Sequence, residues 1–351
     1  MNELKGELLK TATEEAIFNI YLYLAHQTEP SVGDTLSAIT DRLVTEKQRH
    51  PKLWDARAKR QLLILTNATS KNRTLSKARL VALSRSKSGM NACVFEKPNG
   101  SISVVFRGTG DGEWIDNGEG LSGISEENTY HHYPDGETKT FDLRPTDFAT
   151  DQQVEALNWF LETASQNQWN QTTDITVSGH SKGGNKAQFV GIHSALVDRV
   201  ISFDGQGFSP EALAAMQAQF NEDFGERKQK LFSISAENDY VNVLGHRLIP
   251  KKHIYFLKSR FGIHHMDALL DEEGNLNPQT AQGSFSEYIE DVANEIMRMK
   301  PEKRQLATLG MMNLFQRYLG KGEPVNNDFV SLEKTVLGVA IAVREFLRKL
   351  K

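Results

Sequence analysis

The chain has 351 residues, of which 39% are hydrophobic and 25% are charged. These proportions are ordinary for a globular protein and exclude a disordered, collagen-like or coiled-coil chain. Lys and Arg together number 41 against 45 for Asp and Glu, and this near-neutral balance argues against a nucleic-acid-binding protein.

Residues 1–88 are predicted to form a helical N-terminal extension. Further helical patterns run over 35–45, 53–65 and 75–83. The first helix is predicted from apolar residues that recur at spacings of three and four: Leu4, Leu8, Ile17, Ile20, Tyr21 and Leu24.

Residues 89–275 are predicted to form an α/β core. Two β-favouring runs, 92–96 and 102–106, are joined by the turn residues Pro98-Asn99-Gly100 and indicate a hairpin. Further strands are predicted at 175–178, 199–203, 231–235 and 253–257, with helices at 152–165, 185–197 and 210–220. Strands that alternate with helices predict a mostly parallel sheet covered on both faces.

Residues 276–351 are predicted to form a helical C-terminal extension, with helices at 285–299, 303–319 and 332–350. The last helix carries an apolar run over 336–343 that is followed by basic residues. It could lie on a membrane surface or pack on a partner, and the simplest interpretation is a buried helix that covers the core. We expect the three parts of the chain to pack as one unit.

The chain carries no sign of secretion or membrane insertion. Its single cysteine, Cys93, excludes an internal disulfide and a cysteine-rich zinc site. The longest apolar runs are shorter than the ~18 residues that a membrane span needs. The first 25 residues lack the basic and then apolar order of a signal peptide. We expect a soluble, cytoplasmic protein.

The sharpest signal is Gly179-His180-Ser181-Lys182-Gly183, which lies between a predicted strand and a predicted helix. A G-x-S-x-G sequence in this context indicates a nucleophile elbow, a tight turn that exposes a catalytic serine hydroxyl. The alternative is a glycine-rich turn without catalytic use, or one shaped for phosphate. The phosphate-loop pattern G-x-x-x-x-G-K-[ST] is absent here.

A serine nucleophile needs a histidine base and an acid that orients it, in the chain order Ser, Asp, His for this fold. Asp239 follows the predicted strand 231–235, and the adjacent His264 and His265 follow the strand 253–257. Asp204 is the second choice for the acid, or a structural residue in its turn.

An oxyanion hole is expected from two backbone N–H groups. One is that of Lys182, directly after the serine. The other is at Thr109, after the strand 102–106, where the threonine hydroxyl could add a donor.

Four segments together resemble a known family: Val104-Val105-Phe106-Arg107-Gly108-Thr109, Trp114-Ile115-Asp116, Gly179 to Asn185, and Asn238-Asp239-Tyr240-Val241. They resemble the class 3 (fungal-type) lipases, and more closely an uncharacterised bacterial branch of this α/β-hydrolase group with a Gly-His-Ser-Lys-Gly-Gly elbow. The resemblance covers residues 89–275.

The resemblance implies an α/β-hydrolase fold and serine hydrolase chemistry. Ser181, Asp239 and a late histidine would form the triad, with Thr109 and Lys182 as oxyanion donors. His265-Met266-Asp267 is similar to the His-Leu-Asp of the lipases, which favours His265 over His264 as the base.

We therefore expect a lipase-like or esterase-like enzyme that cleaves a small acyl ester or lipid through an acyl-enzyme on Ser181, without a metal or cofactor. The near alternative is a lysophospholipase or acyltransferase. The alternative of another class is a catalytically idle hydrolase fold that serves as a binding module. The segment 110–151 is acidic and shows no apolar lid, which favours short or medium acyl chains.

Overall fold

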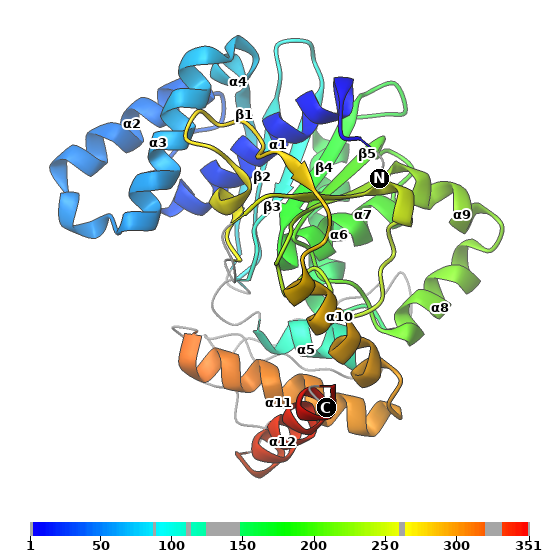
Figure 1. Cartoon of the computed structure of the whole chain (residues 1–351). Coiled ribbons are helices and arrows are strands. Elements are labelled where there is room, and N and C mark those ends of the chain that lie inside the picture. The colour runs from blue at the N-terminus through cyan, green and yellow to red at the C-terminus, as the bar shows by residue number, and fades with distance from the viewer. Residues whose placement is uncertain are drawn as a thin grey trace.

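The computed structural model describes residues 3–86, 89–109, 114–123, 148–259, 264–319 and 332–349. Within these residues one eight-stranded sheet forms the centre, and its strands are ordered in space as they are in the chain (Figure 1). The strands are β1 (Arg79–Arg85), β2 (Asn91–Glu96), β3 (Ile102–Phe106), β4 (Ile175–His180), β5 (Arg199–Phe203), β6 (Leu231–Ala236), β7 (Ile254–Leu257) and β8 (Gln279–Thr280).

The sheet is mixed and mostly parallel, which confirms the predicted fold class. Strands β3 to β7 run parallel, while β1, β2 and β8 pair with their neighbours in antiparallel fashion. The hairpin expected at 92–96 and 102–106 is confirmed as β2 and β3.

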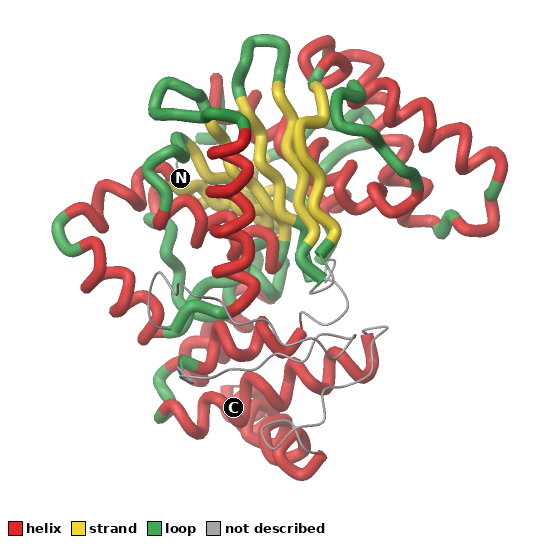
Figure 2. The backbone as a smooth tube through the Cα atoms, turned by 180° about the vertical axis from the view of Figure 1, so that it is seen from behind, coloured by secondary structure: helices red, strands yellow, loops and turns green. Residues whose placement is uncertain are grey.

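Helices cover both faces of the sheet, as Figures 1 and 2 show from opposite sides. Side chains alternate along β2, so that Cys93 and Phe95 join one apolar cluster and Ala92 and Val94 the other. The first cluster holds residues of α1 (Gly6–Leu24), α2 (Leu36–Arg49), α3 (Ala56–Lys71) and α4 (Arg73–Lys77). The second holds residues of α6 (Asp151–Gln166), α7 (Lys182–His193), α8 (Pro210–Phe220) and α9 (Asp223–Arg227).

The N-terminal region differs from the prediction at its end. A helical pattern was expected over 75–83, but residues 79–85 form β1, which pairs with β2. A short apolar run fits a helix and a strand equally well, and here the free edge of the β2–β3 hairpin decides the outcome. The N-terminal helices form one covering layer of the core.

The C-terminal helices lie beyond the carboxyl ends of the parallel strands (Figure 1). They are α10 (Ser284–Met297), α11 (Pro301–Leu319) and α12 (Leu332–Lys349), and α11 packs on α5 (Trp114–Ser122). The guanidinium of Arg304 on α11 donates to the carbonyls of Ser122 and Met297 and to the carboxylate of Glu211. This buried arginine therefore ties α11 to α5, α10 and α8.

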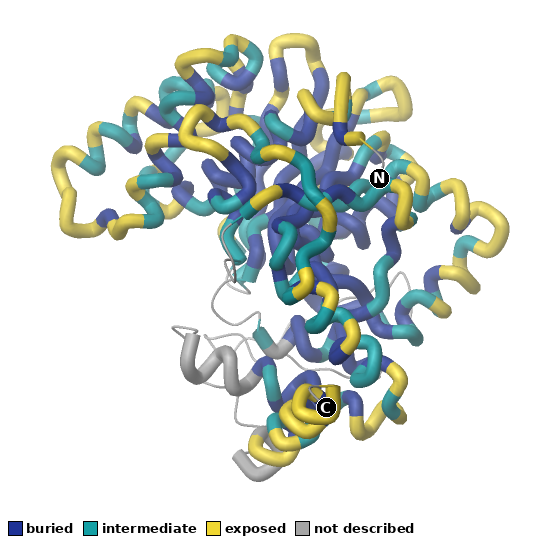
Figure 3. The backbone as a smooth tube through the Cα atoms, viewed as in Figure 1, coloured by how far each residue is buried: buried dark blue, intermediate teal, exposed yellow. Residues whose placement is uncertain are grey.

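The apolar run 336–343 is only partly buried, in contrast to the simplest expectation for α12. Ala342 is 8% exposed, whereas Val336 is 61% and Leu337 51% exposed (Figure 3). Gly338 lies so close to α11 that a Cβ atom there would meet the carbonyl oxygen of Leu306 at 1.8 Å. Within the described residues, no helix combines the length and the apolarity that crossing a bilayer requires.

A buried polar cluster fixes α1 to the middle of the sheet. Glu15 is fully buried and accepts hydrogen bonds from Ser103 on β3 and from Ser178 on β4, the latter at 2.8 Å. Lys97 forms ion pairs with Glu15 at 3.4 Å and Glu14 at 3.1 Å. Burial raises the pKa of Glu15, and the charge of Lys97 opposes this shift.

Replacing Glu15 by Ala is expected to lower the free energy of unfolding by roughly 3–5 kcal/mol, because the change leaves buried donors on Lys97, Ser103 and Ser178 without this acceptor. Urea denaturation followed by circular dichroism measures the effect. Glu29→Ala is the matched control: Glu29 is 89% exposed, and losing its ion pair with Arg85 should cost less than about 1 kcal/mol. Equal losses in the two variants would contradict the importance of the buried cluster.

Candidate active site

Ser181 occupies a tight turn between β4 and α7. Its backbone has φ 60° and ψ −126°, a strained conformation for a residue with a side chain. A Cβ atom at Gly179 would lie 2.2 Å from Gly183, and one at Gly183 would lie 2.0 Å from the carbonyl oxygen of Phe106. Both positions therefore require glycine, and the turn presents Ser181 at the carboxyl edge of the sheet.

His264 and Asp239 form a hydrogen-bonded pair beside this turn. Nδ1 of His264 lies 2.5 Å from Oδ2 of Asp239, which is fully buried. The other carboxylate oxygen accepts the backbone N–H groups of Val241 and Asn242, each at 2.8 Å. The acid is thus held by its own loop and fixes the orientation of the imidazole. Nε2 of His264 is buried and has no hydrogen-bond partner among the described residues.

The preference for His265 as the partner of Asp239 needs correction, because the structure places His264 against the carboxylate. His265 has an extended backbone, with φ −142° and ψ 138°. Neighbouring side chains in an extended segment point to opposite sides, so only one of the two histidines can meet Asp239. Burial, and after it the charge of Arg57, lowers the pKa of His265. The similarity to His-Leu-Asp therefore does not match the observed pair of Asp239 and His264, and which histidine acts as the base stays a prediction.

Asp204, the second choice for the orienting acid, makes different contacts. It follows β5 with φ 47°, and its Oδ1 accepts the backbone N–H of Ala236 at 2.7 Å. Its Oδ2 has no hydrogen-bond partner among the described residues and lies 3.9 Å from Nε2 of His180. Burial, and then the charge of Asp239, raises the pKa of Asp204.

Two residues outside the predicted set of site residues pack directly behind the site. His180 stacks on His264, with ring centroids 4.8 Å apart, and its Nδ1 shares a hydrogen bond of 2.7 Å with the hydroxyl of Tyr23. Burial, and then the neighbouring His264, lowers the pKa of His180 well below its ordinary value, which favours the neutral ring. The position of His180 directly before the serine was the available signal, whereas Tyr23, on the first predicted helix, carried no signal of a role at the site.

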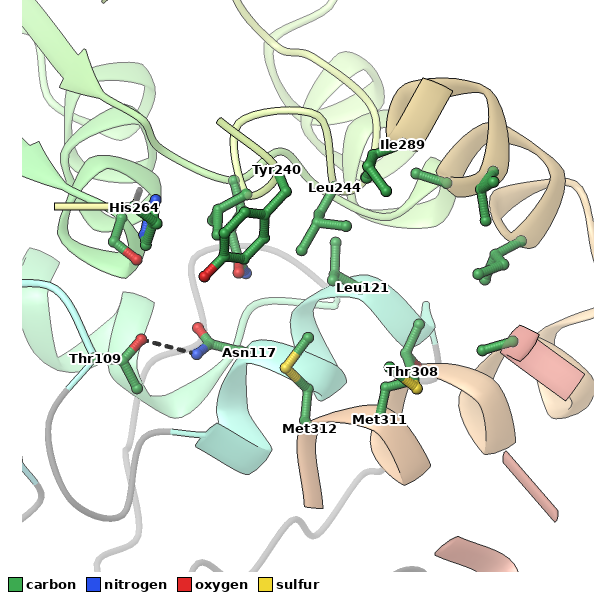
Figure 4. Close-up of a pocket in the computed structure, with 18 of the residues that line it drawn as sticks. Thr109, Asn117, Leu121, Tyr240, Leu244, His264, Ile289, Thr308, Met311 and Met312 are labelled. Carbon is green, nitrogen blue, oxygen red and sulfur yellow. Dashed lines mark hydrogen bonds between the residues drawn. The ribbon is translucent and has the colours of Figure 1, made fainter. Parts of the chain in front are cut away.

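The two expected oxyanion donors lie on neighbouring elements. Lys182 is the first residue of α7, where helix geometry leaves the N–H without an intrahelical acceptor. Its side chain is fully buried and forms an ion pair with Asp116. The hydroxyl oxygen of Thr109 accepts a hydrogen bond of 2.9 Å from the amide of Asn117, so its own proton can be donated elsewhere (Figure 4).

One set of side chains among the described residues could geometrically hold a metal ion. His180, Asp204 and His264 offer ligand atoms that lie within 4.8 Å of one another. Asp239 already occupies Nδ1 of His264, so a metal would have to take Nε2, the nitrogen that a base in this position would need. We therefore assign no metal-dependent step to these residues.

Ser181, Thr109 and His264 line a cavity of about 740 Å³, within the range of roughly 300–1,000 Å³ usual for small-molecule sites. Apolar side chains from α10, α11 and α12 complete its wall, and Figure 4 shows Thr109 and His264 at one side and Ile289 and Met311 at the other. Of the segment 110–151, whose polarity suggested short acyl chains, 110–113 and 124–147 lie outside the described residues. The described part of this segment contributes Trp114 and Leu121 to the lining, and the C-terminal helices supply further apolar side chains.

No protein-family model matches the chain, and no curated protein sequence does either. Solved structures that are similar include a fungal lipase, with 11% identity, a TM-score of 0.44 and coverage of 82% of this chain and 94% of that chain. Lip2 lipase from Yarrowia lipolytica has 14% identity, a TM-score of 0.42 and coverage of 88% and 95%. Rhizomucor miehei lipase, in a propeptide complex, has 13% identity, a TM-score of 0.38 and coverage of 79% and 84%.

The fold class follows from the arrangement of the chain itself. Parallel strands β3 to β7, helices on both faces and a tight serine turn between β4 and α7 define an α/β-hydrolase-like fold.

The raised pKa of Asp204 has a measurable consequence for stability. The folded protein binds the proton of this carboxyl more tightly than the unfolded chain does. The resulting stabilisation is complete below the unfolded pKa of about 3.9, and it is lost as the pH rises through the pKa of the folded state. Asp204→Asn removes the titration and keeps an oxygen for the N–H of Ala236. The free energy of unfolding of wild type should therefore fall relative to the variant as pH increases, by up to about 1.4 kcal/mol per unit. Urea denaturation at a series of pH values tests this, and a pH-independent difference would contradict it.

Proposed function

We propose that the protein is a lipase-like serine hydrolase that cleaves a carboxylic ester through an acyl-enzyme on Ser181. The observation that carries this proposal is the convergence of a strained, glycine-framed serine and a buried His264–Asp239 pair on one cavity. A buried imidazole nitrogen without a partner is costly in a purely structural role. It suits a base that forms its hydrogen bond with serine only during the reaction.

In the proposed mechanism, Nε2 of His264 takes the hydroxyl proton of Ser181 while the serine oxygen attacks the ester carbonyl. Asp239 stabilises the imidazolium that forms. The N–H of Lys182 and the hydroxyl of Thr109 donate to the developing oxyanion. The imidazolium then gives its proton to the leaving alcohol. A water molecule, activated by the same histidine, cleaves the acyl-enzyme and restores Ser181.

Two alternative enzymes would use the same acyl-enzyme and differ in the acceptor or in the substrate. An acyltransferase would pass the acyl group to an acceptor other than water, and a lysophospholipase would use the same steps on a single-chain phospholipid. A catalytically idle binding module would need neither the pairing of His264 with Asp239 nor the strained backbone at Ser181.

Labelling with a fluorophosphonate probe tests the nucleophile. The probe should modify wild type at one site and leave Ser181→Ala unmodified, because it needs an activated serine hydroxyl. Intact-protein mass spectrometry gives the stoichiometry, and peptide mapping gives the position. Equal labelling of both proteins would remove Ser181 as nucleophile, and no labelling of wild type would favour the binding module.

The two histidines provide a matched pair of variants. His264→Ala should lower kcat on a p-nitrophenyl ester by about 10⁴ or more, because it removes the base, while His265→Ala should keep a measurable fraction of activity. Steady-state kinetics on folded variants, checked by circular dichroism, separates the two. The opposite ranking would return the role of the base to His265.

A further inference from the structure

The cavity at Ser181 has two chemically different ends. One end is lined by apolar side chains of the three C-terminal helices, among them Ile289 and Ile296 of α10, Met311 of α11 and Val343 and Phe346 of α12. The other end is lined by Tyr23, Arg57, His180 and His265, which come from the N-terminal helices, the serine turn and the segment after β7. Ser181 and His264 belong to this polar end.

The polar end carries positive charge that its neighbours do not fully balance. The guanidinium groups of Arg57 and Arg107 lie 5.5 Å and 6.0 Å from the ring centre of Tyr23. Among the described residues the one carboxylate paired with either of them is Asp267, 3.5 Å from Nε of Arg57. Asp267 also pairs with Arg60 at 3.4 Å. Asp267 is thus divided between Arg57 and Arg60, and no carboxylate among the described residues pairs with Arg107.

Arg57 is available to a ligand. Its side chain is 37% exposed and lines the cavity, and Asp267 pairs with it through the buried Nε alone, so the terminal nitrogens of the guanidinium have no ion pair among the described residues. Arg60, one helical turn further along α3, has more partners: it pairs with Glu272 and donates to the carbonyl of Leu270. Arg60 does not line the cavity.

The apolar end of the cavity is lined by three helices, α10, α11 and α12, and it reaches the surface of the protein. Val343 and Phe346 line the cavity and are also 45% and 37% exposed, so this part opens to solvent at α12. The hydroxyl of Tyr288 donates to the carbonyl of Phe346 at 2.7 Å and holds α12 against α10. An extended alkyl chain could therefore lie along these helices, with its far end near the opening.

We infer that the substrate is a single-chain amphiphile with an anionic headgroup, of the lysophospholipid type. Its phosphate would bind at Arg57 and its acyl chain along α10, α11 and α12, which places the ester between them at Ser181. Hydrolysis would break the acyl carbon–oxygen bond, add one water and release a fatty acid and a phosphorylated alcohol. This inference rests on the proposed function for the reaction, but the recognition it describes does not depend on turnover.

Binding to the Ser181→Ala protein tests the headgroup site without requiring catalysis. The ligands are 1-lauroyl lysophosphatidic acid and 1-monolauroylglycerol, which share the acyl chain and differ by the phosphate, both used below their micelle concentrations. Calorimetric titration should show that the phosphate compound binds about tenfold more tightly or better, as expected for charge-assisted hydrogen bonds. Equal affinities would overturn the inference.

Two arginine variants in the same background identify the site. Arg57→Met should abolish the difference between the two ligands, because it keeps the length of the side chain and removes its charge. Arg60→Met is the matched control on the same helix and should preserve the difference. If Arg57→Met keeps the tenfold ratio, the phosphate does not bind at Arg57 and the inference fails.

A second pair of variants tests the acyl-chain end. Val343→Asp places a charge in the cavity wall and should weaken binding of the lauroyl ligands at least tenfold, whereas Val336→Asp, on the same helix but outside the cavity, should not. Equal effects of the two changes would overturn the assignment of the chain to this end. Fluorophosphonate labelling of the wild-type protein reports separately on the proposed function. If Ser181 is labelled but the phosphate compound binds no more tightly than the glycerol ester, only the substrate class is rejected.

Discussion

The close approach of the turn after β4 to the end of β3 is the constraint on which the rest of the site depends. Gly183 touches the carbonyl of Phe106 so closely that no side chain fits between them, and Gly179 packs equally tightly on Gly183. These contacts force Ser181 into a left-handed backbone conformation at the carboxyl edge of the sheet. Parallel strands bring the loops after β3, β6 and β7 to the same edge, so Thr109, Asp239 and His264 can meet there.

The N-terminal helices belong to the site as much as to the core. Through Glu15, α1 is hydrogen-bonded to Ser178 on β4, three residues before Ser181. About two helical turns further along α1, the hydroxyl of Tyr23 hydrogen-bonds to His180, which stacks on His264. The orientation of the proposed base therefore depends on a helix that lies far from it in the sequence. A second helix of the same layer, α3, contributes Arg57 to the cavity.

The C-terminal helices give the cavity its apolar character. They are held in place by polar contacts that avoid the cavity: Arg304 joins α11 to three other elements, and Glu295 of α10 pairs with Arg348 and Lys349 of α12. Their apolar side chains are thus free to line the space beside Ser181. The N-terminal layer frames a polar site, and the C-terminal helices add an apolar wall. The two together suit a molecule with one polar and one apolar end.

Those parts of the fold that depend on local pattern could be predicted from the residues alone. The positions of the buried strands, the β2–β3 hairpin and most helices follow from apolar periodicity and turn residues. The serine turn was recognisable because the glycines that its tight geometry requires, Gly179 and Gly183, form a known sequence motif around Ser181. A triad of Ser181, Asp239 and a late histidine was expected from the chain order usual for this fold and from the rule that sites form at the carboxyl ends of parallel strands, and it stays a prediction.

Which side chains meet depends on long-range packing that local pattern does not encode. The choice between His264 and His265 depends on how an extended segment is rotated, and neighbouring residues of the same type carry no signal for that rotation. The strand at 79–85 forms because a sheet edge is available to a run that fits either structure. Tyr23, Arg57 and the apolar wall reach Ser181 from distant parts of the chain, and such long-range packing leaves no periodic trace in the sequence.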